Sequence, residues 1–400
     1  MESVYRTLVL RYDLFHLPPE KVSAFLKIQE EFRRWATEWA KGGGKEPLPR
    51  DNPLRHFAHR FIYAGKMLDW FRGVKKIGVY KMRPPLIFNT QLRLGSEKDI
   101  SSGVFVDIPK RVVKIRKWSG RRGETIVLPL GDKAVEWILA RVREGGRLTL
   151  AAAWVGASRA NRAAKLYVAL IFRREVAPME AKRLLVVDFN ALHNGVAWAI
   201  IEGERIITKG IMKPNVSKIL HLQKAASKLD SACAERDKIC SSAMATKRRV
   251  WRLLRSWEDE VTKKLGHLAL QYRAAVIVDV PRDSSVRALK EGGYSPERKA
   301  LLNFGRLRRR LKGLVEWYGI SYREERLYST MCPHCERKMR ELPNRRVKCQ
   351  CGFETHRDEV PFHWAIKRFS ELTSFFNSSF SPSAAAVGVL IFKLMCFVSS

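Results

Sequence analysis

Four cysteines near the C-terminal end constrain the fold more than any other feature of this chain. Cys332 and Cys335 form a Cys-x-x-Cys pair, Cys349 and Cys351 form a Cys-x-Cys pair, and 13 residues separate the two pairs. Two tight pairs across a short basic hairpin can bring four thiolates to one tetrahedral Zn²⁺ ion. Because four thiolates leave no coordination position for water, we expect a structural zinc ribbon that is too small to fold by burial alone.

Three aspartates stand where they could form a second metal site. Asp188 ends the apolar run that begins at Leu184, Asp279 ends the run that begins at Ala275, and Asp358 follows the cysteines and begins a helical segment. An isolated aspartate at such a position is usually a turn residue or a helix cap. Together, however, the strand, strand and helix predict an RNase H-like arrangement of carboxylates, which need hard cations such as Mg²⁺ to offset their repulsion. Two such ions can activate water and stabilise the leaving oxygen in phosphodiester hydrolysis.

The charge of the chain indicates a polyanionic partner. Its 75 lysines and arginines outnumber 40 acidic residues and give a formal net charge of +35. A folded chain with this excess repels itself unless a polyanion neutralises it, so nucleic acid is the expected partner. The candidate phosphate contacts lie in predicted helices; they are Lys247, Arg248, Arg249, Arg306, Arg308, Arg309 and Arg310. The alternative is that some of these side chains only solvate helix surfaces.

The hydrophobic pattern divides the chain into a β-rich first half and an α/β second half. A strand over residues 1–15 and short strands over 79–175, interrupted by a helix near 132–143, predict a small β-barrel, and residues 16–78 predict a helical insert. In the second half, residues 183–188, 196–202 and 205–213 predict a three-stranded meander with turns at Asn194-Gly195 and Glu202-Gly203. The remaining predicted elements are helical segments over 216–273 and 297–318 and strands over 274–280 and 321–325.

The other cysteines and the two ends of the chain indicate a cytoplasmic protein. Cys233 and Cys240 are seven positions apart in a helical stretch, which favours ordinary packing over a second metal site or a disulfide. The first residues lack the apolar core of a signal peptide. The tail over 370–400 becomes apolar from Ala384 to Val398 but is too short to predict a membrane span.

From about residue 182 to 369, the sequence resembles TnpB, the RNA-guided nuclease that insertion sequences encode and that is related to type V CRISPR effectors. The matching motifs are Val186-Val-Asp188-Phe-Asn190, Ala275-Val-Ile-Val-Asp279-Val-Pro281, Tyr328-Ser-Thr-Met-Cys332-Pro-His-Cys335 and Cys351-Gly-Phe-Glu-Thr-His-Arg-Asp358. In that family they are the three RuvC motifs, with a zinc ribbon before the third. The resemblance implies a RuvC-like nuclease domain over 182–369 with the zinc ribbon inserted at 328–355, and a first half that forms an OB-like wedge barrel with a helical recognition insert.

The resemblance further implies an RNA-guided, Mg²⁺-dependent DNA endonuclease of the prokaryotic cytoplasm. Asp188, Asp279 and Asp358 would be the catalytic ligands of two Mg²⁺ ions, and the partners would be a guide RNA from the transposon end and a double-stranded DNA target beside a short motif. The chain departs from the family pattern at the second motif, where Asp279 stands in place of the usual Glu. This shorter carboxylate leaves an alternative open, namely a nuclease-weak or nuclease-dead RNA-guided DNA-binding protein.

Overall fold

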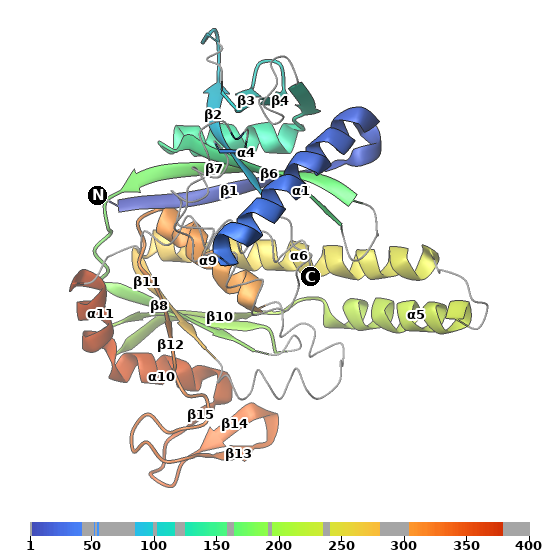
Figure 1. Cartoon of the computed structure of the whole chain (residues 1–400). Helices are drawn as coiled ribbons and strands as arrows, with labels where there is room; N and C mark the ends of the chain where they lie inside the picture. Colours follow the sequence, from blue (N-terminus) through green and yellow to red (C-terminus); the bar gives the residue numbers. More distant parts are fainter. Residues whose placement is uncertain are drawn as a thin grey trace. The chain divides into compact units, whose positions relative to one another are not determined.

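The computed structural model describes ten ranges of the chain: 2–41, 52, 54–55, 85–98, 102–116, 125–157, 164–190, 194–234, 241–280 and 304–378. These residues fall into two compact units, of which one runs from Glu2 to Glu175 and the other begins at Val176 (Figure 1). Most of the predicted insert over 16–78 and most of the predicted tail over 370–400 lie outside the described residues.

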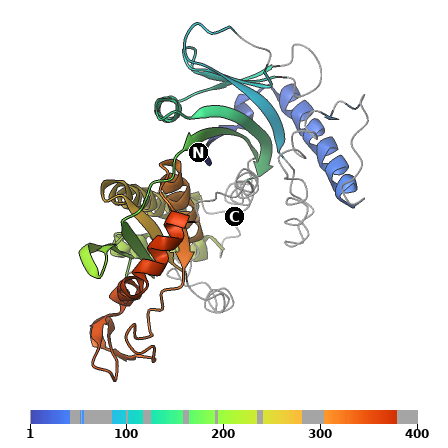
Figure 2. The same cartoon turned by 90° about the vertical axis from the view of Figure 1, so that its left-hand side faces the viewer.

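The first unit contains one seven-stranded sheet with the strand order β1-β7-β6-β2-β3-β4-β5. The strands are β1 (Glu2–Asp13), β2 (Leu86–Arg93), β3 (Val104–Asp107), β4 (Val112–Arg116), β5 (Thr125–Pro129), β6 (Arg147–Ala157) and β7 (Ala164–Val176). Strands β2 and β3 are parallel, and the sheet is strongly curved (Figure 2). Since no pairing joins β1 to β5 within the described residues, closure into a barrel stays a prediction.

Two helices of the first unit lie where the sequence pattern predicts them. Helix α1 (Pro19–Lys41) buries Phe25, Phe32 and Ala36, which share one face at helical spacing. Gln29, also on this face, is fully buried, and its side-chain oxygen accepts a hydrogen bond from the Val155 N–H at 3.0 Å. Helix α4 (Asp132–Arg143) confirms the predicted helical interruption of the strands.

The second unit is built on a five-stranded mixed sheet with the order β10-β9-β8-β11-β12. The strands are β8 (Arg183–Phe189), β9 (Val196–Glu202), β10 (Arg205–Met212), β11 (Ala274–Asp279) and β12 (Tyr322–Glu325). The first three confirm the predicted antiparallel meander. Its first turn requires glycine, because Gly195 has a φ of +76° and an added Cβ would lie 2.2 Å from the Met212 carbonyl oxygen. Strand β11 is parallel to both β8 and β12.

The two faces of this sheet bury different side chains against different helices. One face, which includes Leu185 and Val276, packs on α6 (Ser241–Gln271) and α9 (Phe304–Trp317). The opposite face, which includes Val186 and Ile277, packs on α10 (Val360–Lys367) and α11 (Phe369–Ser378) (Figure 1). Because side chains alternate along a strand, Asp188 and Asp279 belong to the face that α10 covers.

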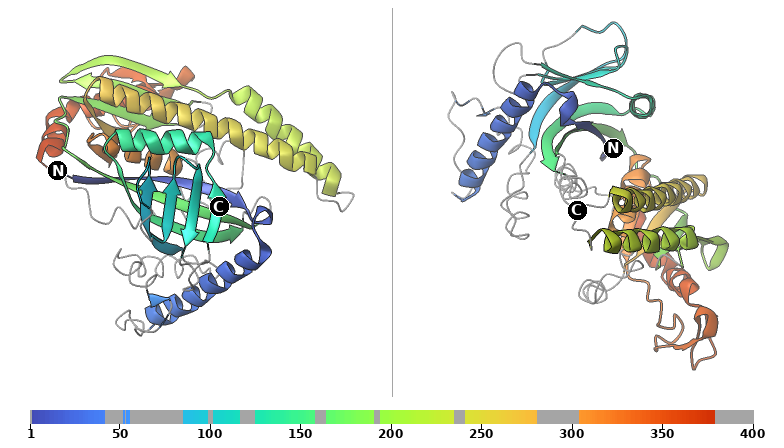
Figure 3. Two further views of the ribbon diagram at one scale, coloured as in Figure 1. Left: turned by 90° about the horizontal axis from the view of Figure 1, so that it is seen from above. Right: turned by 90° about the vertical axis from the view of Figure 1, so that its right-hand side faces the viewer.

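A long helical hairpin occupies the chain between β10 and β11. Helix α5 (Val216–Ala234) runs beside the first half of α6, and the two bury Ile219, Val250 and Leu254 between them (Figure 3). The expectation for Cys233 is wrong, because this residue of α5 is disulfide-bonded in the structure. Among the described residues, none of the helices combines the length and apolar character that a membrane crossing needs.

Candidate functional site

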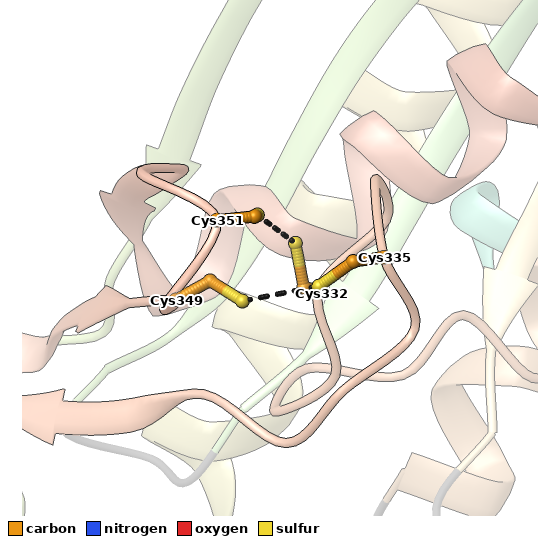
Figure 4. Close-up of side chains that lie close together, drawn as sticks. All are labelled: Cys332, Cys335, Cys349 and Cys351. Carbon is orange, nitrogen blue, oxygen red and sulfur yellow. Dashed lines mark hydrogen bonds between the residues drawn. The ribbon is translucent and has the colours of Figure 1, made fainter.

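The four predicted zinc ligands converge in space. The sulfur atoms of Cys332, Cys335, Cys349 and Cys351 all lie within 4.8 Å of one another. Cys332 Sγ is 3.5 Å from Cys351 Sγ, and Cys335 Sγ is 3.3 Å from Cys349 Sγ (Figure 4). Tetrahedral Zn–S bonds of about 2.3 Å place sulfur atoms about 3.8 Å apart, so the cluster is compatible with structural zinc. The N–H of Arg337 lowers the pKa of Cys335 to about 7, whereas burial raises the pKa of Cys332 and of Cys349.

The cysteine cluster is joined to the sheet through α10. Three short strands, β13 (Arg340–Leu342), β14 (Arg346–Lys348) and β15 (Glu354–His356), carry the second cysteine pair and continue into α10. The Trp364 indole N–H of α10 donates to the Met331 carbonyl at 2.9 Å, directly beside Cys332. The short segment between β15 and α10 contains Asp358. The position of the third acid therefore depends on the cysteine cluster and on α10 together.

Asp188 is a buried candidate acid at the end of β8. Only 6% of the residue is exposed, and its carboxylate accepts a hydrogen bond from the Asn190 side-chain amide at 2.8 Å. Burial, followed by the negative charges of Asp279 and Asp358, raises the pKa of Asp188 to about 8 against the lowering effects of Asn190 and Arg345. The parallel register of β11 with β8 sets Asp279 beside Asp188, and Arg345 contacts both Asn190 and Asp358, so the three acids lie in one region of the second unit.

The other two acids are held by neighbouring groups. Asp279 accepts a hydrogen bond from the Leu327 N–H at 2.7 Å, and burial raises its pKa. Asp358, of which 3% is exposed, forms an ion pair with Arg345. Within the described chain, the cysteine group is the only set of three or more potential ligand residues whose ligand atoms lie within 4.8 Å of one another. The oxygen atoms of the three carboxylates are therefore farther apart than the four cysteine sulfur atoms.

Arg345 is a site residue that the sequence reasoning missed. Its guanidinium binds Asp358 and also donates to the Asn190 side-chain oxygen at 3.2 Å, so it connects the first and third acidic motifs. It lies in the turn between β13 and β14 with a φ of +58°. Its only distinguishing signal is its place four residues before Cys349, which does not separate it from the other basic residues of the hairpin.

Several of the predicted phosphate-binding residues form ion pairs within the second unit. The Arg306 side chain is 13% exposed and pairs with Glu258, whose side chain is 2% exposed, and Arg308 pairs with Glu324 at 3.1 Å. Arg310 pairs with Asp259 and Lys247 with Asp230. Arg248 and Arg249 lie on the exposed face of α6, and Arg309 is exposed on α9. Because its partner is buried, Arg306 has a structural role that joins α9 to α6.

The raised pKa of Asp188 predicts that this acid destabilises the magnesium-free protein as the pH rises. Between pH of about 4 and 8, the folded state keeps a proton that the unfolded state has lost, so the free energy of unfolding falls by about 1.4 kcal/mol per pH unit. The neutral variant Asp188→Asn removes this dependence. We expect its stability advantage over the parent protein to grow from pH 5 to pH 8 in urea denaturation without magnesium but with zinc retained. An advantage that is the same at both pH values would contradict the assignment.

Comparisons with known proteins give one match in sequence and several in structure. Residues 304–360 match the family model described as Cas12f1-like, TNB domain, whereas no curated protein matches the chain. A cryo-EM structure of a Cas12f1-sgRNA-target DNA complex aligns with a TM-score of 0.48 and 10% identity over 87% of this chain and 80% of that chain. A CRISPR-Cas12f ternary complex aligns with a TM-score of 0.33 and 11% identity over 87% of this chain and 79% of that chain. The segment that carries α9, the cysteine cluster and Asp358 is therefore similar to the TNB domain of Cas12f1-like proteins.

Proposed function

We propose that this chain is an RNA-guided, Mg²⁺-dependent DNA endonuclease encoded by a transposon. The observation that supports the proposal is that Asp188 and Asp279 share the sheet face that α10 covers and that Asp358 lies just before α10, where its charge and that of Asp279 add to burial in raising the pKa of Asp188. Asp188 and Asp279 stand at the carboxyl ends of the parallel strands β8 and β11. An antiparallel meander with two further strands added parallel to its first strand is the arrangement of an RNase H-like, RuvC-type nuclease domain.

The donor set fits magnesium. All three groups are carboxylates, and the negative charge that they would share when ionised is only partly offset by Arg345. Asp188, Asp279 and Asp358 would hold two Mg²⁺ ions, which supply an activated water and stabilise the leaving oxygen of the phosphodiester. In this proposal Asn190 orients the Asp188 carboxylate, and Arg345 holds Asp358 at the site.

The partners follow from charge and from the TNB match. A net charge of +35 suits a protein that contacts many phosphates of an RNA–DNA duplex and of a displaced strand, while base pairing supplies sequence specificity. We propose that the guide RNA comes from the transposon end and that exposed cations such as Arg248 and Arg249 on α6 contact backbone phosphates. The curved sheet of the first unit would form the wedge that reads a short motif beside the target.

A second candidate function is guided DNA binding with weak or no cutting. The favouring observation is Asp279, whose carboxylate is one methylene shorter than that of Glu and is engaged by the Leu327 N–H at 2.7 Å. A short, already bonded carboxylate has less reach towards a metal than the Glu of the related family. In this case Asp279→Glu would increase cutting by an otherwise weak protein.

The test combines the full chain with RNA transcribed from its flanking locus. A plasmid library carries a matching target beside randomised bases and is incubated with Mg²⁺ or with Mg²⁺ chelated. Cutting that requires Mg²⁺ and enriches one flanking motif supports the nuclease. RNA-dependent binding without cutting supports the second candidate, and neither binding nor cutting would contradict both.

A further inference from the structure

Arg326 occupies a position beside the acidic site that none of the roles above uses. It follows the end of β12 and directly precedes Leu327, whose N–H donates to the Asp279 carboxylate at 2.7 Å. Its side chain is exposed, and its guanidinium carbon lies 4.6 Å from the centre of the Tyr328 ring. The positive charge of Arg326 also attracts the negative charge of the Asp279 carboxylate. A cation is thus held at the solvent side of the proposed metal ligands.

Arg326 differs from the surrounding arginines in forming no ion pair or hydrogen bond with a carboxylate among the described residues; it acts on Asp279 only at longer range. The neighbouring arginines are all paired with carboxylates: Arg323 with Glu325 at 2.7 Å, Arg368 with Glu325 at 3.2 Å, Arg308 with Glu324 at 3.1 Å and Arg345 with Asp358. In these ion pairs, the positive charges of arginines near β12 and α10 are neutralised by carboxylates. Arg326 therefore keeps its hydrogen-bond donors and its charge for a ligand that arrives from solvent.

A phosphodiester is the ligand that this geometry suits. A guanidinium presents a planar fork of donors that matches two phosphate oxygens, and the aromatic ring beneath it fixes the plane of the fork. The approach of a polyanion to three buried acids is electrostatically unfavourable, and an unpaired cation at their rim reduces that cost. A carboxylate ligand could bind the same donors. The large positive charge of the chain, however, favours a polyanion such as nucleic acid over a single carboxylate.

We propose that Arg326 binds a backbone phosphate of the DNA strand next to the bond that is cut, and that Tyr328 is the positioning residue that holds its guanidinium. This inference rests on the proposed nuclease function and adds a substrate contact to it. Tyr328 is itself fixed by packing, because its ring centre lies 5.2 Å from that of Trp364 on α10. The same helix begins beside Asp358, so one element positions both the third acid and the support for Arg326.

Single-turnover cutting by the full chain with its guide RNA tests the proposal. We expect Arg326→Ala to slow cutting about 100-fold, since a misplaced scissile phosphate costs roughly that much. Arg326→Lys should recover part of the rate because it keeps the charge but loses the fork. Arg205→Ala removes an equal, exposed charge from β10 on the same sheet and should cut at the parent rate. A parent-like rate for Arg326→Ala would overturn the inference.

A chemical change in the DNA separates a phosphate contact from a structural effect. A series of DNA substrates carries one neutral methylphosphonate each, at or beside the cut bond. We expect one of these substitutions to slow cutting by the parent protein but to cause no further slowing in Arg326→Ala. Equal additional slowing of both proteins at every position would overturn the contact. Tyr328→Phe keeps the ring and should cut at the parent rate. Tyr328→Leu keeps an apolar side chain but has no ring, so it should cut as slowly as Arg326→Ala. Combining Tyr328→Leu with Arg326→Ala should cause little further slowing.

The outcomes also distinguish this inference from the proposed function. If the parent protein cuts and Arg326→Ala cuts equally well, only the phosphate contact fails. If the parent protein does not cut, the salt dependence of its affinity for a single-stranded oligonucleotide decides instead. Loss of one phosphate contact reduces the slope of log affinity against log salt by about 0.7 for a single strand. A slope unchanged in Arg326→Ala would then reject the contact independently of nuclease activity.

Discussion

Replacing Asp188 with alanine is expected to abolish DNA cutting and to leave guide RNA binding intact. Asp188 is buried and interacts with the charges of both other acids, and its removal takes away the carboxylate that would be shared between metal ions. The loss should exceed the roughly 100-fold that an outer hydrogen-bond partner of a metal ligand contributes. The measurement is the rate of plasmid cutting with saturating RNA and Mg²⁺, beside the affinity of each protein for that RNA.

Two variants control this experiment. Asp132→Ala removes an aspartate whose side chain is 74% exposed on α4, and it should cut at the parent rate. Asp188→Asn keeps the shape and the packing of the side chain but cannot carry the charge, so it should be as inactive as Asp188→Ala. Cutting by either Asp188 variant at a parent-like rate would reject the acid as a metal ligand.

Loss of zinc is the second large expected effect. The strands β13, β14 and β15 contain three residues each, and the buried apolar side chains in and beside them, such as Met339 and Val347, are too few to fold the segment by burial. Structural zinc contributes about 10–16 kcal/mol to the folding of such small units. We expect Cys332→Ser to lose the bound zinc and to cut far more slowly, because Arg345 and Asp358 are placed by the same segment.

The measurements are metal content and proteolysis of the purified proteins. The parent protein should contain about one zinc per chain, and Cys332→Ser should contain little and be cleaved by protease between the two cysteine pairs. Lys338→Ser changes an exposed side chain in the same segment that offers no thiolate, and it should leave both properties unchanged. Full zinc content in Cys332→Ser, or protease resistance without zinc, would contradict the assignment of a metal-dependent fold.

Local sequence patterns predict the helices and strands of this protein better than they predict which strands pair with one another. The apolar runs before Asp188 and Asp279 predict two buried strands, and the alternation of side chains places both acids on one face. The parallel pairing of β11 with β8 joins residues that are far apart in the chain, and no local pattern specifies it. The cysteine cluster was predictable because metal ligands combine a rare residue type with a fixed spacing.

The roles of individual arginines were not predictable. Arg306, Arg326 and Arg345 are alike in sequence terms, but the first is held by a buried acid, the second stacks on Tyr328 and the third binds Asp358. These differences arise from tertiary contacts between α6, α9, β12 and the cysteine segment. Charge counts predict nucleic acid as a partner, yet they cannot separate cations that stabilise the fold from those that face solvent.

The order in which the site residues are synthesised has a consequence for the cell that makes this protein. Asp188 and Asp279 leave the ribosome well before Asp358, which comes after all four cysteines. A chain grows at roughly 5–20 residues per second, so for many seconds a nascent polypeptide displays strongly basic surfaces while lacking its third acid. Prematurely terminated products that end before the cysteines would share this defect. If the proposed nuclease activity is correct, incomplete chains could associate with the host chromosome but could not cut it.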